Sequence, residues 1–147
     1  MVTLIGKCLN MTITSYHLKG VQFMKLPPCP NSRNCVSTMG SPDDKQHYMD
    51  PIAFDGEPEE AKSIMRSLLK NDPLAEIEQE DVDYMKAVYK VKLLPFKDDV
   101  EFYFGQQGFV HFRSASRVGY SDLGKNRKRM KALKEQFREE YKRQAAT

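Results

Sequence analysis

The stretch that decides the fold runs from Val100 to Arg117 and reads VEFYFGQQGFVHFRSASR. Apolar and polar side chains alternate along it on both sides of a central Gln-Gln-Gly sequence. This period of two is typical of half-buried β-strands, so the stretch predicts an antiparallel hairpin with one apolar face. Aligning that face on both strands places Phe102 opposite Phe112, because a slip of one residue would turn every side chain to the wrong side.

The same register makes predictions for the turn and for the outer face of the hairpin. It closes residues 106–108 as a three-residue loop, in which Gly108 takes the left-handed conformation that such loops require. On the outer face it places Glu101 opposite Arg113. A cross-strand ion pair of this kind contributes only about 0.2–1 kcal/mol, so it adjusts the stability of the sheet without holding it together.

Further strands are predicted before the hairpin. Residues 82–94 alternate in the same way, with Leu93 on the apolar side, and residues 95–98 are expected to form the turn into the hairpin. Residues 47–54 favour a short strand that Pro51 confines to an edge or a bulge. Residues 27–46 are rich in Pro, Asn, Ser and Asp and are expected to form a loop.

Two segments have the helical pattern, residues 57–70 and residues 125–143. The second carries an apolar stripe made of Met130, Leu133, Phe137 and Tyr141. Since both helices and the sheet have one apolar side each, we predict a two-layer α+β fold. Its antiparallel meander of four to five strands would carry both helices on one face. The arrangement is similar to helix-grip folds, a similarity of architecture alone.

Length and composition suit one domain. The chain has 147 residues, 40% of them hydrophobic and 29% charged, which argues against a disordered or fibrous protein. We expect an N-terminal arm or leader at residues 1–26, a single domain at 27–143 and a tail at 144–147. No apolar run approaches the roughly 20 residues that span a bilayer. The first apolar stretch is too short for a secretory signal, so we predict a cytoplasmic protein.

Positive charge is concentrated near the C-terminus. Residues 125–143 hold nine basic and three acidic side chains, which gives +6, whereas the whole chain carries only +3. Such a segment could meet nucleic acid or an anionic surface, although a solvated helix face is the simpler interpretation. We therefore predict that nucleic acid is not a partner; the sequence leaves the oligomeric state open.

The cysteines leave two alternatives open. Three cysteines without a secretion signal favour free thiols. In an oxidising compartment, however, Cys29 and Cys35 could close a small loop. Structural zinc needs four closely paired ligands, and the histidines of this chain are scattered. We predict neither a metal site nor a cofactor.

A candidate binding site follows the hairpin, in residues 113–129, RSASRVGYSDLGKNRKR. Either Ser121 or Asp122 could cap the helix that begins there. Free amide groups, the positive end of the helix dipole and several arginines make an anion site physically plausible. The predicted ligand-binding residues are Arg113, Ser116, Arg117, Ser121, Asp122, Asn126 and Arg127.

These residues favour a non-enzymatic binding protein for an anionic or amphipathic, lipid-like small molecule. The first alternative is a hydrolase or lyase that uses Asp98 or Asp99 with Ser116. We expect instead that the acidic cluster of Asp98, Asp99 and Glu101 pairs with arginines across the sheet. The second alternative is a partner-binding scaffold that uses the basic C-terminal helix.

Three blocks of the sequence carry a family resemblance: residues 28–37 (PCPNSRNCVS), residues 98–102 (DDVEF) and residues 113–129. Over about residues 27–138 the chain resembles the bacterial and plant-plastid family called domain of unknown function 1499. The resemblance implies no activity. It implies that the shared pattern includes Cys29, Cys35, Asp98, Asp99, Arg113, Ser116, Arg117, Gly119, Asp122, Gly124, Asn126 and Arg127. Many relatives carry leaders, which makes a plastid or exported compartment the alternative location.

Overall fold

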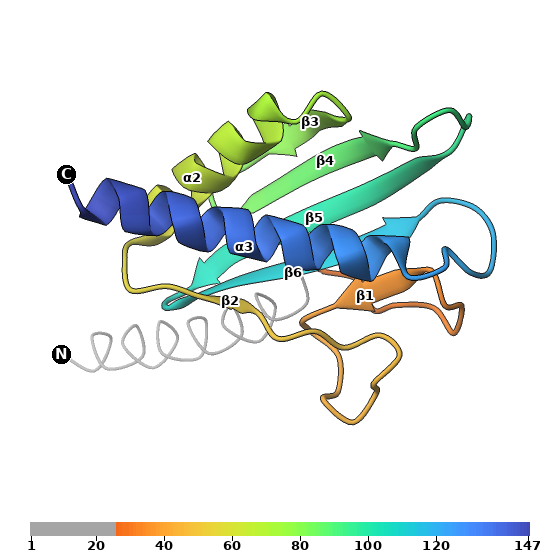
Figure 1. The fold of residues 1–147 in the computed structure, drawn as a ribbon. Coiled ribbons are helices and arrows are strands. Elements are labelled where there is room, and N and C mark those ends of the chain that lie inside the picture. Colours follow the sequence, from red (N-terminus) through yellow and green to blue (C-terminus); the bar gives the residue numbers. More distant parts are fainter. Residues whose placement is uncertain (1–25) are drawn as a thin grey trace, which may run out of the picture.

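The computed structural model describes residues 26–147, so all but the last residue of the expected N-terminal arm lies outside the described residues. Eight elements follow one another along the chain. They are β1 (Cys35–Ser37), β2 (Ile52–Ala53), α2 (Pro58–Asn71), β3 (Ala75–Glu80), β4 (Tyr84–Lys90), β5 (Lys97–Gln106), β6 (Phe109–Ser116) and α3 (Lys125–Ala145) (Figure 1).

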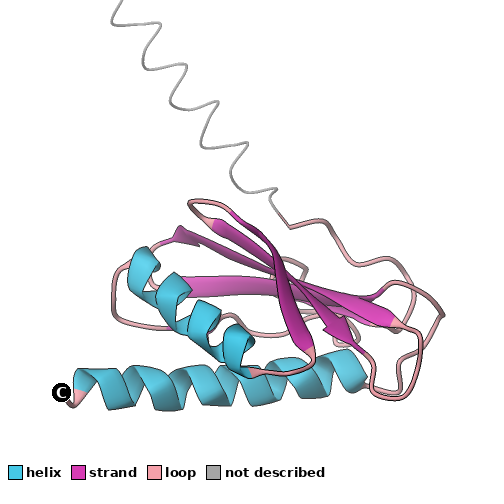
Figure 2. Cartoon of the chain, turned by 90° about the horizontal axis from the view of Figure 1, so that it is seen from above, coloured by secondary structure: helices cyan, strands magenta, loops and turns pink. Residues whose placement is uncertain are grey.

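The strands form one antiparallel sheet with the order β1-β6-β5-β4-β3, and β2 also pairs with β6. Both helices cover the same face of the sheet (Figure 2). The predicted α+β class and its two layers are confirmed, but the sheet has six strands rather than four to five. The additional strand is β1, which lies in the segment expected to be a loop; three residues are too few to show a period.

The core lies between the sheet and the two helices. The predicted pairing of Phe102 with Phe112 is confirmed, and both side chains are completely buried. Phe104 from β5 and Phe137 from α3 help to fill the space between α3 and the sheet. Complete burial of one such side chain contributes about 1.5–3 kcal/mol, so this layer dominates the stability of the fold.

The pairing of β5 with β6 follows the predicted register as far as Tyr103 and His111 and then shifts by one residue. Gln106 pairs with Phe109, so the turn has two residues instead of the predicted three. The shift falls at Gly105, where a Cβ atom would overlap the ring of Tyr103. Gly108 has a φ of 86°, as the turn prediction requires.

The sequence patterns place both helices correctly, within two residues at each end. Pro58 occupies the first turn of α2, where its missing N–H is no loss, and Glu59 and Glu60 complement the helix dipole. Among residues 26–147, no helix is long and apolar enough to cross a membrane.

Cys29 and Cys35 form a disulfide, so the oxidised alternative is the one that the structure contains. Their Cα atoms are 5.7 Å apart, a usual separation for this bond. The disulfide closes the loop that leads directly into β1. It therefore fixes one side of the site described next.

Candidate functional site

Two loops meet at one end of the sheet. Residues 91–96 join β4 to β5 and residues 117–124 join β6 to α3, and both lie at the right-hand end in Figure 1. The backbone N–H of Arg117 donates to the carbonyl of Lys97 at 3.1 Å, which holds the two loops together. Between them lies a cleft of about 510 Å³, which we call the end cleft.

The floor of the end cleft is polar. It contains the side chains of Asp98, Ser116, Asp122 and Lys125. Asp98 was expected in the turn of residues 95–98; it lies instead in β5, where it shares the inward orientation of Val100 and is completely buried. A buried carboxylate is stable only with close partners. Arg129 Nη2 and Lys125 Nζ contact it at 2.5 Å and 2.9 Å.

Asn126 connects the start of α3 to the sheet. Its side chain is completely buried. Its Oδ1 accepts from Ser114 Oγ at 2.6 Å, and its Nδ2 donates to Ser116 Oγ at 2.9 Å. Arg129 also donates to Asn126 Oδ1, at 2.8 Å, so one network joins this amide to the carboxylate of Asp98. Because a buried polar group without partners is costly, this network fixes the position of α3 on β6.

Asp122 caps α3 from two residues before its N-cap. Its carboxylate accepts from the backbone N–H groups of Gly124 and Asn126, both at 2.9 Å, and from Asn126 Nδ2 at 2.6 Å. Burial alone would raise the pKa of Asp122, but these hydrogen bonds outweigh burial and hold the pKa below its ordinary value. Asp122 thus occupies donors at the helix start that were predicted to receive an anion.

The loop that precedes α3 is also held by the disulfide segment, residues 29–35. Asn34, next to Cys35, donates to the carbonyls of Gly119 and Val118 at 2.7 Å and 3.2 Å. The carbonyl of Asn34 accepts from Asn126 Nδ2 at 3.2 Å. The segment before β1 and the β6–α3 junction, which are more than 80 residues apart in sequence, therefore meet behind the end cleft.

The mouth of the end cleft is apolar. Leu94, Phe96, Val118 and Leu123 line it. We call these four exposed side chains, together with the exposed Leu93 of the β4–β5 loop, the apolar rim. Leu93 was predicted to continue the inward face of β4. The strand ends at Lys90 instead, because the chain already reverses direction over residues 91–96, and Leu93 points into solvent at 94% exposure.

Two leucines of the apolar rim have unusual backbones. Leu93 has a φ of 65° and Leu123 a φ of 55°. The left-handed region costs a residue with a Cβ atom about 1–2 kcal/mol, and glycine is its usual occupant. Leu93 and Leu123 are 94% and 98% exposed, so burial of their side chains does not offset this cost. Strained residues of this kind cluster at functional sites.

The structure separates the predicted site residues into groups. Ser116, Ser121 and Asp122 line the end cleft, and Asn126 lies behind its floor. The predicted arginines point elsewhere. Arg113 pairs with Glu101 at 3.1 Å and Arg117 pairs with Asp99 at 2.8 Å, both on the outer face of the sheet. Arg127 donates to the carbonyls of Lys45, Gln46 and Tyr48.

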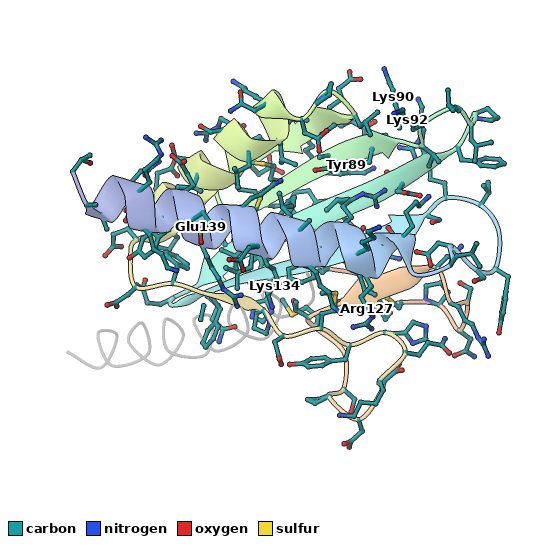
Figure 3. All side chains as sticks on the ribbon, in the orientation of Figure 1. Tyr89, Lys90, Lys92, Arg127, Lys134 and Glu139 are labelled. Carbon is teal, nitrogen blue, oxygen red and sulfur yellow. A yellow bond between two sulfur atoms is a disulfide. The ribbon has the colours of Figure 1, made fainter. Side chains whose placement is uncertain are left out.

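Arg127 lines a second hollow of about 610 Å³, which we call the basic groove. It lies between α3 and residues 42–50, on the side of α3 where Figure 3 labels Arg127 and Lys134. Lys134 donates to the carbonyl of Asp50 at 2.6 Å. Burial and the nearby charge of Arg138 lower the pKa of Lys134, as expected where cations crowd together.

The geometry bears on the catalytic alternatives as well. Asp99 is on the outer face, so the sheet separates it from the floor of the end cleft. Asp98 stands opposite Ser116 in the ladder, but its carboxylate already accepts from two cations and Ser116 Oγ accepts from Asn126. A general base needs a lone pair available to the reacting proton. The contacts of Asp98 therefore hold α3 in position on the sheet. Within residues 26–147, no three His, Cys, Asp or Glu side chains gather as a metal site.

Sequence reasoning named Asp98 but placed it in a turn, and it missed Arg129, Asn34 and the apolar rim. A signal existed for Asp98, since even-numbered residues of β5 face inward from Val100 to Phe104. For Arg129 and Asn34 no local signal exists, because their partners lie 31 and 92 residues away.

The family model described as "Protein of unknown function (DUF1499)" matches residues 25–137. The chain belongs to this family. None of the curated proteins and none of the solved structures matches it. The expected resemblance is confirmed, and the DUF1499 region extends from the disulfide segment into α3, so it contains both sides of the end cleft.

Proposed function

We propose that this DUF1499 protein is a non-enzymatic binding protein that holds an anionic amphipathic small molecule in its end cleft. One observation carries the proposal: a polar floor and an apolar rim share one hollow of about 510 Å³. That size is within the range of small-molecule sites, which are about 300–1,000 Å³. Either half alone would fit a simpler ligand, whereas both together fit a molecule with a charged head and an apolar tail.

Lys125 is the group best placed to meet the anionic head. Its side chain is 36% exposed, against 14% for Arg129, although both contact Asp98. An ammonium group has three donors, so Lys125 can keep Asp98 and still donate toward the mouth of the end cleft. Asp122 already accepts from backbone N–H groups at the start of α3, so these groups are not available to the ligand. The anionic head is therefore expected to bind a side chain.

The tail would lie against Leu94, Phe96 and Val118, which line the end cleft and are about half exposed. Covering these side chains removes apolar area from water and contributes about 25 cal/mol for each Å². A head group without a tail would not gain this contribution, so the proposal predicts that amphiphiles bind more tightly than simple anions.

The test compares three probes: decyl phosphate below its micelle concentration, inorganic phosphate and decyl maltoside. We expect decyl phosphate to give the largest rise in melting temperature and to shift amide NMR signals of residues 91–98 and 116–125. Lys125→Gln should weaken its binding about tenfold, since hydrogen bonds to charged groups contribute about 1.5–3 kcal/mol. Lys142→Gln, at the far end of α3, is the matched control. If none of the three probes shifts these signals, the proposal is wrong.

A second candidate function rests on the basic groove. Lys45, Arg127, Lys131, Lys134 and Arg138 line it against only Asp50 and Glu135. This excess of positive charge supports an acidic partner segment along α3. Salt-sensitive retention on heparin, reduced by Lys131→Gln but not by Lys142→Gln, would support this scaffold function. Retention that both variants leave unchanged would contradict it.

The disulfide supports the exported alternative for the location of the protein, because disulfides persist in oxidising compartments. Thiol labelling of protein taken directly from its native cells tests this proposal. Labelled Cys29 and Cys35 would favour the cytoplasmic prediction instead.

A further inference from the structure

The apolar rim lies on the two loops at one end of the sheet (Figure 1). Its most exposed members, Leu93 and Leu123, sit on two different loops that border one cleft. Glycine would satisfy the backbone at both positions, yet both carry large apolar side chains. An exposed apolar group of this kind marks a surface that meets an apolar partner.

Lysines accompany the apolar rim. Lys90 and Lys97 flank the β4–β5 loop and Lys92 lies in it, and Lys125 and Lys128 follow the β6–α3 loop. Figure 3 labels Lys90 and Lys92 at the end of β4, beyond Tyr89. Residues 84–97 contain no acidic side chain. The acidic residue of the second loop, Asp122, is engaged in capping α3.

We propose that this end of the protein docks onto the surface of an anionic lipid bilayer. The apolar rim enters the headgroup region and the surrounding lysines contact lipid phosphates. The proposal goes beyond the binding of a soluble amphiphile and does not depend on it. An apolar tip ringed by lysines is the pattern of interfacial membrane binding, in which buried apolar area and attraction to anionic lipids act together.

The size of the surface favours a bilayer over a protein partner. A stable protein interface buries about 800 Å² on each side and uses about 20–30 residues. The apolar rim has five side chains on two separate loops, which suits shallow insertion into a fluid surface. Charge complementarity points the same way, because each lysine near an anionic leaflet adds attraction.

Sedimentation with vesicles tests the proposal. We expect the protein to sediment with vesicles of phosphatidylcholine and phosphatidylglycerol but much less with phosphatidylcholine alone. The double variant L93N/L123N should lower the partition coefficient about tenfold or more, since each leucine contributes through its buried area. Lys92→Gln should lower it about fivefold. Equal sedimentation with both compositions, or none with either, overturns the proposal.

Misfolding cannot explain the result expected for L93N/L123N, because asparagine tolerates the left-handed backbone better than leucine does. Val82→Asn is the matched control. Val82 is 89% exposed in the β3–β4 turn, at the opposite end of β4 from Leu93, so its substitution should leave vesicle binding unchanged. If the wild-type chain self-associates in solution and only L93N/L123N abolishes this, a second copy covers the apolar rim and the membrane proposal is wrong.

A single fluorophore gives a direct readout, because the chain contains no tryptophan. Leu93→Trp should show a blue-shifted emission when anionic vesicles are added, whereas Val82→Trp should not. An unchanged Leu93→Trp spectrum overturns the proposal. If monomeric decyl phosphate binds but vesicles do not, the proposed function stands and only this inference is wrong. If vesicles bind but decyl phosphate does not, this inference stands and the proposed function is wrong.

Discussion

The two ends of the sheet meet the same backbone requirement with different residues. At the β5–β6 turn, the left-handed position is held by Gly108, which has no Cβ atom to strain. At the end cleft, Gly119 and Gly124 hold two left-handed positions in the same way, but Leu93 and Leu123 hold two more and expose nearly all of their side chains. The comparison teaches that the turn end follows the preferences of folding, whereas the cleft end keeps side chains that folding does not need.

The cleft end can carry this strain because the polar network behind it is firmly fixed. Asp98, Asn126 and Asp122 each make several hydrogen bonds or ion pairs within a few ångströms of the loops. Strained residues persist where the surrounding structure over-determines them. The predictions below test whether the two ends differ in this way, and they run from the largest expected effect to the smallest.

The largest effect should come from Asp98→Ala. It leaves Arg129 and Lys125 without their buried partner, and breaking a buried pair from one side costs about 3–5 kcal/mol. The neighbouring variant Asp99→Ala, on the outer face, should cost no more than about 1 kcal/mol, since its ion pair is partly exposed. Urea unfolding of both variants measures the difference. Similar losses would mean that the cleft end is no more firmly fixed than the outer face.

Reduction of the disulfide should have the next largest effect. Opening the Cys29–Cys35 loop removes roughly 2–3 kcal/mol in the chain-entropy model and loosens Asn34, which holds the β6–α3 loop. Thermal unfolding with and without reductant measures the loss. Cys29→Ser should behave like reduced protein and should not respond to reductant. Amide exchange should increase at Gly119 but not at Gly108, and an equal increase at both ends would contradict this account.

Substitutions at Leu93 and Leu123 should have the opposite sign to a substitution at Gly108. Leu93→Gly and Leu123→Gly should each raise the unfolding free energy by up to about 1 kcal/mol, because relief of strain exceeds the entropy lost by glycine. Gly108→Ala should lower it by about 1 kcal/mol. Chemical unfolding of the three variants provides the measurement. A loss of stability in both leucine variants would show that their side chains serve folding after all.

The smallest expected effect is a difference in pH dependence between the ends. Burial lowers the pKa of His111, which bonds to Gln106 near the turn end. The unfolded state therefore binds more protons, and stability falls as the pH drops below about 6.5. The pKa of Asp122 lies below its ordinary value of 3.8, so its contribution is lost only in more acidic solution. His111→Gln should reduce the loss of stability below about pH 6.5, and Asp122→Asn should reduce the loss in more acidic solution. Melting curves across pH that neither variant alters would contradict this assignment.

Much of the architecture was predictable because strand and helix periods are local. The alternation around Val100 and Phe112 fixed the register and the inner face, and the stripe from Met130 to Phe137 fixed the packed side of α3. The prediction of a turn at residues 95–98 was wrong because the polar side chain of Asp98 suggested a turn, although its place in the alternation assigns it to the core face.

The candidate site was less predictable, because its composition depends on contacts between distant segments. Composition suggested that the arginines would converge at the helix start, whereas alternation sends Arg113 and Arg117 to the outer face, where acidic neighbours pair with them. The helical period likewise turns Arg127 away from Arg129. Of the predicted residues, Ser116, Ser121, Asp122 and Asn126 lie at the junction between β6 and α3, where the polar pattern predicted them.

The hydrogen bond between Asn126 and the carbonyl of Asn34 joins residues that are 92 positions apart. Contacts of such long separation form slowly, because the intervening chain must be ordered before they are made. During synthesis, the hairpins can pair before α3 has left the ribosome, but the end cleft cannot be completed until the last helix arrives. A nascent or truncated chain would thus contain most of the sheet and lack the end cleft, so the proposed binding would be acquired only in the final step of assembly.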